Sequence, residues 1–314
     1  MAHHDVPDVY NRLWTAQHEP VLSIRSGDTI SFDVRDAADG QLESYRNGDE
    51  VPHRDGSRSY PMRGPIMVDG AEPGDVLEIE PLEFRPMGWG FTASRPGAGL
   101  LPDDFTESYI YKWDLSNGQT SAFLDVATVP LRPFLGVMAC TPHTAEPLPV
   151  MPPGNFGGNM DIRDLVVGTK IYLPVSLAGA RFMFGDPHAA QGDGEVCVTA
   201  IEAPLSGCLK VTLHKGRSIR SPQFQTSGPL RTGIEDLGYY ATTGVGPDLH
   251  EAARDSLRNM IDHMCFTYRI QPHEAYLLSS VVVDLKISEV VDSPNWIVSA
   301  YLPLSVMRSS SHGW

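Results

Sequence analysis

Short runs of alternating polar and apolar residues recur along this chain, and several follow a turn signal. Residues 29–34 alternate after Ser-Gly-Asp at 26–28, and residues 76–80 follow Pro-Gly-Asp at 73–75 in the same way. Successive side chains of a strand point to opposite faces, so this period of two predicts half-buried β-strands. The same reasoning predicts strands at 170–173, 196–202, 209–213, 284–291 and 296–302.

One stretch has a strong helical period. After Pro247-Asp248, apolar or small residues recur three and four positions apart, which gives a helix one apolar face. These residues are Leu249, Ala253, Leu257, Met260, Ile261 and Met264. A shorter helix is expected at 272–278, whereas 40–63 and 86–120 are polar or punctuated by glycine. We expect these two segments to be long loops near the mouth of a site. Four aromatic residues are available there to line an apolar pocket: Trp89, Phe91, Tyr109 and Trp113.

The order of these elements indicates the fold class. Many strands, few helices and no repeated βαβ unit predict a β-rich α+β fold, with sandwich-like or barrel-like sheets beside one long and a few short helices. The proline-rich segment 141–153 is unsuited to a helix or a central strand. We therefore expect an N-terminal β-rich domain over residues 1–145 and a C-terminal α+β domain over 146–314.

Charge and cysteine content narrow the class of protein further. Asp and Glu outnumber Lys and Arg by 39 to 24, a net charge of −15, which argues against nucleic acid or an anionic membrane as a partner. The first residues lack a basic and apolar signal, and no apolar run reaches the roughly 18 residues of a membrane span. The four cysteines have no CxxC spacing, which favours a reducing compartment. We expect a cytoplasmic protein.

Two glycine-rich segments concentrate the side chains that bind ligands. Residues 185–195 read GDPHAAQGDGE and hold one imidazole, three carboxylates and one carboxamide. Residues 152–161 read PPGNFGGNMD and end in an amide and a carboxylate. Glycine permits positive φ and close backbone approach, so both segments are suited to folding around a metal ion or a polar substrate. A single strand-like run, 169–184, lies between them.

Asp186 and His188 stand two residues apart, so an extended backbone would place both side chains on one face. A histidine nitrogen and a carboxylate oxygen suit zinc and related divalent ions. The alternative is that His188 hydrogen-bonds Asp186 and only stabilises a turn. The density of ligand-type residues around this pair favours the metal site.

Three further residues are candidates for catalysis. Glu195 leads into an apolar run, and burial there would raise its pKa, as suits a general base; the alternative is an exposed charge at a strand edge. Asn159 would donate to a developing oxyanion, and Asp161 would bind metal or position water. The alternative for both is an Asx turn that closes the glycine loop.

Catalytic sites built on a serine or cysteine nucleophile find less support. The chain has no Gly-x-Ser-x-Gly nucleophile elbow. Cys140 and Cys197 lie in apolar surroundings and are expected to be core residues rather than nucleophiles. Catalysis through a covalent serine or cysteine intermediate is therefore not expected.

The two glycine-rich segments and the sequence between them resemble the acetamidase/formamidase family of amide hydrolases. The shared pattern is PPG-x-x-GGN-x-D, then L-x-x-G-x-x-x-x-LPV-x-x-x-GA, then GD-x-H-A-x-QGDGE, and the resemblance runs from about residue 15 to 305. It implies a β-rich fold and hydrolysis of formamide, acetamide or a related small amide by a metal-activated water. It also implies a homo-oligomer. A lactam or other cyclic-amide hydrolase, and a non-catalytic metal or small-ligand binding module, are the alternatives.

The resemblance also implies a set of site residues. His18 and Asp36 match the family by position as further metal ligands, although Asp33 or Asp39 would fit the place of Asp36 equally. Gln191 and Gly158 would contact the substrate. The expected cofactor is a divalent metal ion, zinc in the first place and calcium as the alternative.

Overall fold

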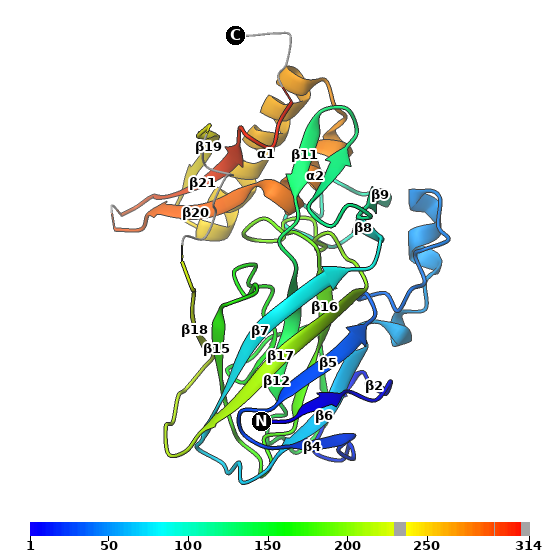
Figure 1. Ribbon diagram of the computed structural model, residues 1–314. Coiled ribbons are helices and arrows are strands. Elements are labelled where there is room, and N and C mark those ends of the chain that lie inside the picture. The colour runs from blue at the N-terminus through cyan, green and yellow to red at the C-terminus, as the bar shows by residue number, and fades with distance from the viewer. Residues whose placement is uncertain (229–236, 292, 309–314) are drawn as a thin grey trace.

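The computed structural model describes residues 1–228, 237–291 and 293–308. Two large β-sheets face each other at one end of the molecule, and α1, α2 and a smaller sheet lie at the other end (Figure 1). The described part of the chain is strand-rich and contains no closed barrel. The predicted β-rich α+β fold with sandwich-like sheets, one long helix and few short ones is confirmed.

The first large sheet has the order β1-β5-β17-β7-β15-β18. Its strands are β1 (His3–Asp5), β5 (Thr29–Val34), β17 (Leu205–His214), β7 (Val76–Pro86), β15 (Lys170–Pro174) and β18 (Gln223–Gln225). The second has the order β14-β12-β16-β6-β2, with β4 also paired to β6. Its strands are β14 (Gly157–Asn159), β12 (Phe134–Cys140), β16 (Phe182–His188), β6 (Met62–Val68), β2 (Tyr10–Asn11) and β4 (Leu22–Ile24).

The remaining described elements are three two-stranded pairs, a three-stranded sheet and four helices. The pairs are β8 (Trp89–Ser94) with β9 (Tyr109–Asp114), β10 (Thr120–Phe123) with β11 (Ala127–Pro130), and β3 (Leu13–Trp14) with β13 (Leu148–Pro149). The small sheet consists of β19 (Tyr239–Gly246), β21 (Trp296–Pro303) and β20 (Asp284–Glu289). The helices are α1 (Leu249–Tyr268), α2 (Pro272–Val282) and the short 3-10 helices η1 (Gly48–His53) and η2 (Gly56–Arg58).

The alternation of buried and exposed residues along the strands explains how the two large sheets pack against each other. On β5, Ile30, Phe32 and Val34 are buried while the residues between them are more exposed. The ring of Phe32 lies 4.4 Å from that of Phe184 on β16, so the two sheets meet through apolar side chains. Burying such a side chain stabilises a fold by about 1.5–3 kcal/mol. β16, which carries the candidate site, is thus held from one face by the sandwich core.

The helices close the other end of the molecule. The Asp248 side chain accepts a hydrogen bond from the Glu251 backbone N–H, as the N-cap of α1, and the face predicted from its period is buried except at its first residues. On α2, the Tyr276 hydroxyl donates to the Val196 carbonyl at 2.6 Å and accepts from the Leu101 N–H at 3.2 Å. These bonds anchor the loop that follows Glu195. Within the described residues, no helix is both long and apolar enough to cross a bilayer.

Three local predictions were wrong. The run 169–184 is two strands in different sheets, because Gly179, Ala180 and Arg181 all have positive φ and turn the chain. Residues 196–202 form turns, since Val198 has a φ of 73° that a strand does not adopt. The segment 86–120 contains the β8–β9 pair instead of being only a loop.

Strands on the two sides of the expected domain boundary pair with one another. β12 precedes residue 145 and pairs with β16, and β5 and β7 both pair with β17. Both large sheets therefore draw on both halves of the chain. The division into domains 1–145 and 146–314 stays a prediction, and these pairings do not favour it.

Candidate active site

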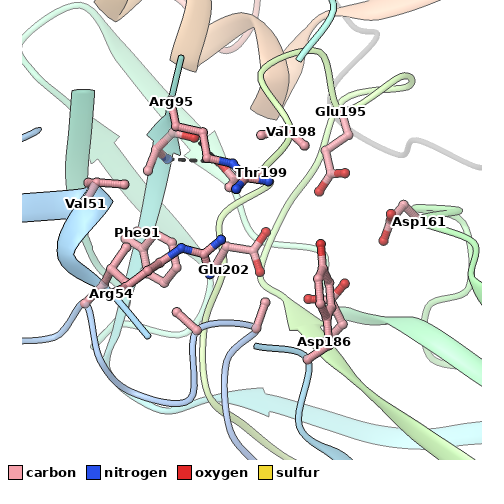
Figure 2. A pocket seen from close by; sticks show the side chains of 15 residues that line it. Val51, Arg54, Phe91, Arg95, Asp161, Asp186, Glu195, Val198, Thr199 and Glu202 are labelled. Atoms are coloured by element: carbon pink, nitrogen blue, oxygen red, sulfur yellow. Dashed lines mark hydrogen bonds between the residues drawn. The ribbon is translucent and has the colours of Figure 1, made fainter. Parts of the chain in front are cut away.

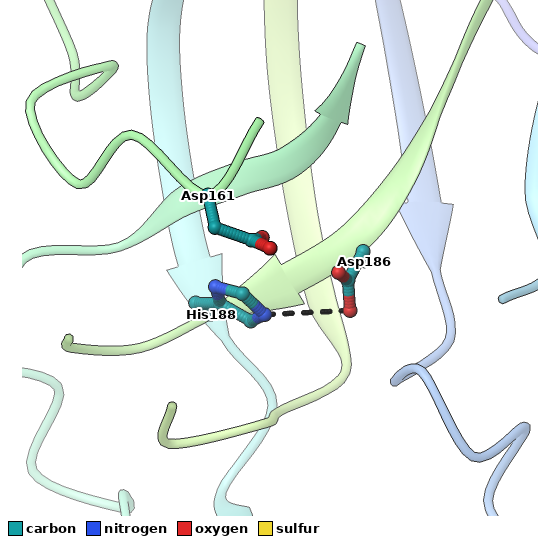
Figure 3. A group of neighbouring side chains, drawn as sticks. All are labelled: Asp161, Asp186 and His188. Atoms are coloured by element: carbon teal, nitrogen blue, oxygen red, sulfur yellow. Dashed lines mark ion pairs between the residues drawn. The ribbon is translucent and has the colours of Figure 1, made fainter. Parts of the chain in front are cut away.

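The site is built at the end of β16, where Asp186 and His188 lie side by side. His188 Nε2 is 3.3 Å from Asp186 Oδ1 (Figure 3). β16 pairs with β12 on one side and β6 on the other, and the Phe134 ring packs edge-on against the imidazole with centroids 5.0 Å apart. Both side chains are almost fully buried. The predicted proximity of these two residues is confirmed, although Asp186 has a φ of 54°, so the extended backbone on which the prediction rested is not present there.

The second glycine-rich segment brings Asp161 to the same point. β14 pairs with β12, and the backbone N–H groups of Met160 and Asp161 both donate to the Gly136 carbonyl, at 2.9 and 3.3 Å. The Asp161 side chain then faces His188 (Figure 3). Asp161, Asp186 and His188 each offer one ligand atom, and these atoms lie within 4.8 Å of one another.

Gly136 makes room for this group. A Cβ at residue 136 would lie 2.4 Å from Asp161 Oδ1 and 3.0 Å from both Asp186 Oδ2 and His188 Cε1. Any other residue there would push the ligand atoms apart. Sequence analysis did not identify Gly136, since it sits inside an apolar run with no turn signal.

A second group of potential ligands shares His188. Its Nε2 lies 3.3 Å from Glu202 Oε1 and 3.9 Å from Glu195 Oε1. Glu202 is 3% exposed, and its backbone exchanges two hydrogen bonds with Phe91. Glu202 was not among the predicted site residues. Its one signal in the sequence is a carboxylate at the end of the apolar run 196–202.

Burial and crowding change how these groups bind protons. Burial, followed by the charge of Asp186, raises the pKa of Asp161 to about 7, although His188 opposes this. Burial also raises the pKa of Glu202 to about 7, and burial with Asp161 raises the pKa of Glu195 well above its usual range. Burial alone would lower the pKa of His188, but Glu202 and Asp186 outweigh it and raise that pKa. The group is therefore suited to exchanging protons near neutral pH.

Many polar atoms of this group have no hydrogen-bond partner among the described residues. These buried atoms are Asn159 Oδ1, Asp161 Oδ1, Asp186 Oδ1, both ring nitrogens of His188, and Glu202 Oε2. Buried polar atoms nearly always have a partner in folded proteins. Carboxylate oxygens and an imidazole nitrogen are a donor set that zinc accepts, so the residues fit a divalent metal ion.

The N-terminal candidates do not join either group of ligands in the described structure. His18 is partly exposed, and its Nε2 lies 3.1 Å from the Leu13 carbonyl. Asp36 is buried and closes a turn by accepting from the N–H groups of Ala38 and Gly40, at 2.8 and 3.0 Å. Of its alternatives, Asp33 is exposed on β5, and Asp39 forms ion pairs with Arg12, Arg35 and Arg58. The assignment of His18 and Asp36 as metal ligands finds no support in this geometry.

The two expected substrate contacts have structural partners. Gln191 is buried, and its Nε2 donates to the Asp161 carbonyl at 2.7 Å, which holds the two glycine-rich segments together. Gly158 lies on β14 opposite Met138 with a φ of 90°, so glycine is needed there for the backbone path. Contact of Gln191 or Gly158 with substrate stays a prediction.

A cavity opens in front of the carboxylates (Figure 2). It is lined by Ala37, Ala38, Leu42, Val51, Arg54, Tyr60, Phe91, Ala93, Arg95, Asp161, Asp186, Glu195, Val198, Thr199 and Glu202. Its volume, counted over positions of the centre of a water molecule, is about 60 Å³. At about 10–15 Å³ for one water, this is room for a small molecule only. The segment 40–63 contributes to the wall, as predicted, whereas of the four aromatic residues expected there only Phe91 lines the cavity.

The cysteines behave as core residues. Cys140 and Cys197 are fully buried, and burial raises the pKa of Cys197 to about 11 and that of Cys140 further. A thiol with so high a pKa is a poor nucleophile at neutral pH. The cavity is instead lined by the carboxylates of Asp161, Asp186, Glu195 and Glu202, with the His188 imidazole beside them.

Comparison with known proteins identifies relatives across the whole chain. The model of the Acetamidase/Formamidase family matches residues 1–150 and 144–309. A formamidase from Methylophilus methylotrophus is 26% identical over 96% of this chain and 89% of its own length. A gamma lactamase from Delftia acidovorans superposes with a TM-score of 0.90 at 25% identity, covering 98% of this chain and 91% of that one. An acetamidase from Bacillus halodurans gives 0.68 at 29% identity, with 97% of each chain covered.

Proposed function

This chain belongs to the acetamidase/formamidase family, and from that premise we propose that it hydrolyses the C–N bond of small linear amides to a carboxylate and ammonia. The observation that carries this proposal is the convergence of four carboxylates on one small cavity, with the His188 imidazole in both groups of potential ligands. The carboxylates are those of Asp161, Asp186, Glu195 and Glu202. Formamide and acetamide are the first substrates to test, since relatives carry those activities in their names.

In the proposed mechanism, Asp161, Asp186 and His188 hold a divalent metal ion, zinc in the first place, with Glu202 beside them. When bound, such an ion polarises an amide carbonyl and lowers the pKa of water. The five polar groups enclose the reacting centre and limit the access of bulk water. Glycine at 136 keeps the ligand atoms at their short separations.

Glu195 is proposed as the proton carrier. Its side chain is 16% exposed and lines the cavity, and burial, followed by the charge of Asp161, raises its pKa, as suits a group that takes up a proton and donates it again. It takes one proton from the attacking water and passes it to the amide nitrogen as the C–N bond breaks. Asn159 would donate its Nδ2 hydrogen to the oxyanion that forms on the carbonyl oxygen.

Hydrolysis of a γ-lactam is the second candidate. The specific reason is the TM-score of 0.90 with the gamma lactamase, against 0.68 with the acetamidase from Bacillus halodurans. The same site would open a ring by the same water attack, and the amine would stay attached to the product. A non-catalytic metal-binding module on this scaffold would release neither ammonia nor a ring-opened product.

The test is elemental analysis of the purified protein together with hydrolysis of formamide, acetamide and a γ-lactam before and after chelation. We expect a stoichiometric divalent metal, activity on at least one linear amide, loss on chelation and recovery on adding metal. Full activity without metal would overturn the metal-dependent mechanism. Metal without turnover of any amide would favour the binding module, and turnover of the lactam alone would favour the second candidate.

We also propose a homo-oligomer in the cytoplasm. All four cysteines are free, which is typical of a reducing compartment. Light scattering of the purified protein would measure the assembly, and a monomer would overturn that part of the proposal.

A further inference from the structure

Two arginines reach into the cavity opposite the carboxylates. Arg54 directly follows η1, and Arg95 directly follows β8. Figure 2 shows their side chains approaching from one side, while Asp161 and Glu195 lie on the other. Neither arginine belongs to the glycine-rich segments that hold the amide-cleaving groups.

These arginines have few protein partners. Arg54 donates to the Ser59 hydroxyl at 2.7 Å, and within the described ranges no carboxylate oxygen lies within 4.0 Å of either guanidinium. The buried Arg63 and Arg163 differ, because they pair with Asp8 and Asp284. A guanidinium has five N–H donors in a planar fork, so most of the donors of Arg54 and Arg95 remain available to a ligand.

The electrostatics of the pair also favour an anion. Burial, and after it the charge of Arg95, lowers the pKa of Arg54. The attraction of Glu202 is smaller than the repulsion between the two arginines. An anion placed between two guanidinium groups would relieve this repulsion and form charge-assisted hydrogen bonds.

We propose that the cavity takes an amide that also carries a carboxylate, with Arg54 and Arg95 binding the carboxylate while the amide faces His188 and Glu195. This inference rests on the proposed function and names its substrate class. The apolar wall formed by Leu42, Val51 and Phe91 would cover the short carbon chain between the two ends.

The size of the cavity sets the length of this chain. A volume of about 60 Å³ favours a short substrate, so we expect the monoamide of a short dicarboxylic acid, such as malonamate or succinamate. Water adds to the amide carbon, the C–N bond breaks, the nitrogen takes a proton and leaves as ammonia, and a dicarboxylate remains. The carboxylate held by the arginines does not react.

The experiment compares succinamate with butyramide, which has the same chain length but a methyl group in place of the carboxylate. We expect the unmodified enzyme to favour succinamate in kcat/KM by about tenfold or more. Arg54→Gln and Arg95→Gln should each lower kcat/KM for succinamate by about 10- to 100-fold, mainly through KM, and leave butyramide within about twofold. The control is Arg25→Gln, since Arg25 is 85% exposed and lies outside this cavity.

The outcomes separate this inference from the proposed function. Turnover of butyramide equal to that of succinamate would overturn the inference and leave the amidase proposal intact. An equal loss on both substrates in the arginine variants would assign the arginines to the reacting centre and also overturn it.

If neither succinamate nor butyramide is hydrolysed, the amidase proposal fails. The proposed carboxylate site at Arg54 and Arg95 is then tested by binding alone. Calorimetric titration with succinate, the product, should then show saturable binding that the double Arg54→Gln, Arg95→Gln variant loses. Absence of binding to the unmodified protein would overturn the inference.

Discussion

Buried carboxylates occur in two regions of this protein, and the two regions shift the pKa of those groups in opposite directions. Asp28 and Asp75 close the turns that precede β5 and β7, and the pKa of each is lowered to about 2. Asp161 and Glu202 stand in the cavity, and the pKa of each is raised to about 7. Asp28, Asp75 and Glu202 are all at most 5% exposed, so exposure of the residue alone does not separate the regions.

The difference lies in desolvation, which is the largest cause of the raised pKa of Asp161 and Glu202, and in the hydrogen-bond partners, which lower the pKa of Asp28 and Asp75. Asp28 accepts from the N–H groups of Ala2 and Arg25, and Asp75 accepts from Lys215 and from the N–H of Gly216. Such bonds stabilise the charged form. The carboxylates of the cavity face other carboxylates and a single imidazole, and several of their oxygens have no partner in the described residues. A carboxylate whose bonds are complete therefore stabilises the turn, whereas a crowded, incompletely bonded group indicates a functional site.

The largest effect is expected from His188→Ala, because His188 belongs to both ligand groups. Mutating a residue that only hydrogen-bonds a metal ligand lowers metal affinity or activity by about 10- to 100-fold. Loss of a ligand itself should therefore lower kcat/KM for acetamide by at least about 100-fold. The fold should persist, as measured by circular dichroism. The matched control is His214→Ala, since His214 pairs with Glu78 at 2.8 Å on the sandwich. Unchanged turnover of acetamide by His188→Ala would show that His188 has only a structural role.

Glu202→Gln should have the next largest effect. It keeps the shape of the side chain and removes a charge 3.3 Å from His188 Nε2, so we expect metal affinity and kcat/KM to fall by about 10- to 100-fold. Metal titration and steady-state kinetics measure this. Glu78→Gln, at a buried carboxylate of the sandwich, should leave both quantities unchanged. If Glu202→Gln and Glu78→Gln lowered metal affinity and kcat/KM equally, the carboxylates of the cavity and of the sandwich would not differ in function.

Gly136→Ala tests the spacing of the ligand atoms without changing any of them. Its Cβ would lie 2.4 Å from Asp161 Oδ1, so Asp161 must move, and we expect metal affinity to fall by about tenfold. Alanine in a strand is otherwise favoured over glycine by about 0.5–1 kcal/mol, so unfolding in urea should not shift strongly. Gly56→Ala meets no atom within 4 Å and is the control. Normal affinity in Gly136→Ala would contradict the proposed ligand set.

Asp75→Ala should have the smallest effect, and on stability alone. Loss of its bonds should lower the free energy of unfolding at pH 7 by about 1 kcal/mol, with kcat unchanged. Because the folded pKa of Asp75 is depressed to about 2, its contribution is complete above the usual aspartate pKa and is lost as the pH falls toward 2. Urea unfolding at several pH values measures the difference between the two proteins. A difference that does not shrink on acidification would contradict the assigned bonds.

The sequence by itself determined the elements whose cause is local. Alternation over 29–34 predicted β5, and the period after Asp248 predicted α1. The glycine-rich segments could also be identified, because ligand side chains and glycines are concentrated within about ten residues. The matching family model confirmed the resemblance that these segments carried.

The tertiary structure alone decided what depends on distant pairing. Gly136 meets Asp161 only because β14 folds back on β12, and Glu202 reaches His188 only because the chain at 196–202 turns with positive φ at Val198. Arg54 and Arg95 come from segments with no motif of their own. The periodicity of a segment indicates which face of that one element is buried. A site, in contrast, depends on which elements meet. Pairing between strands that are remote in sequence has no local signal in either strand, so only the tertiary structure shows it.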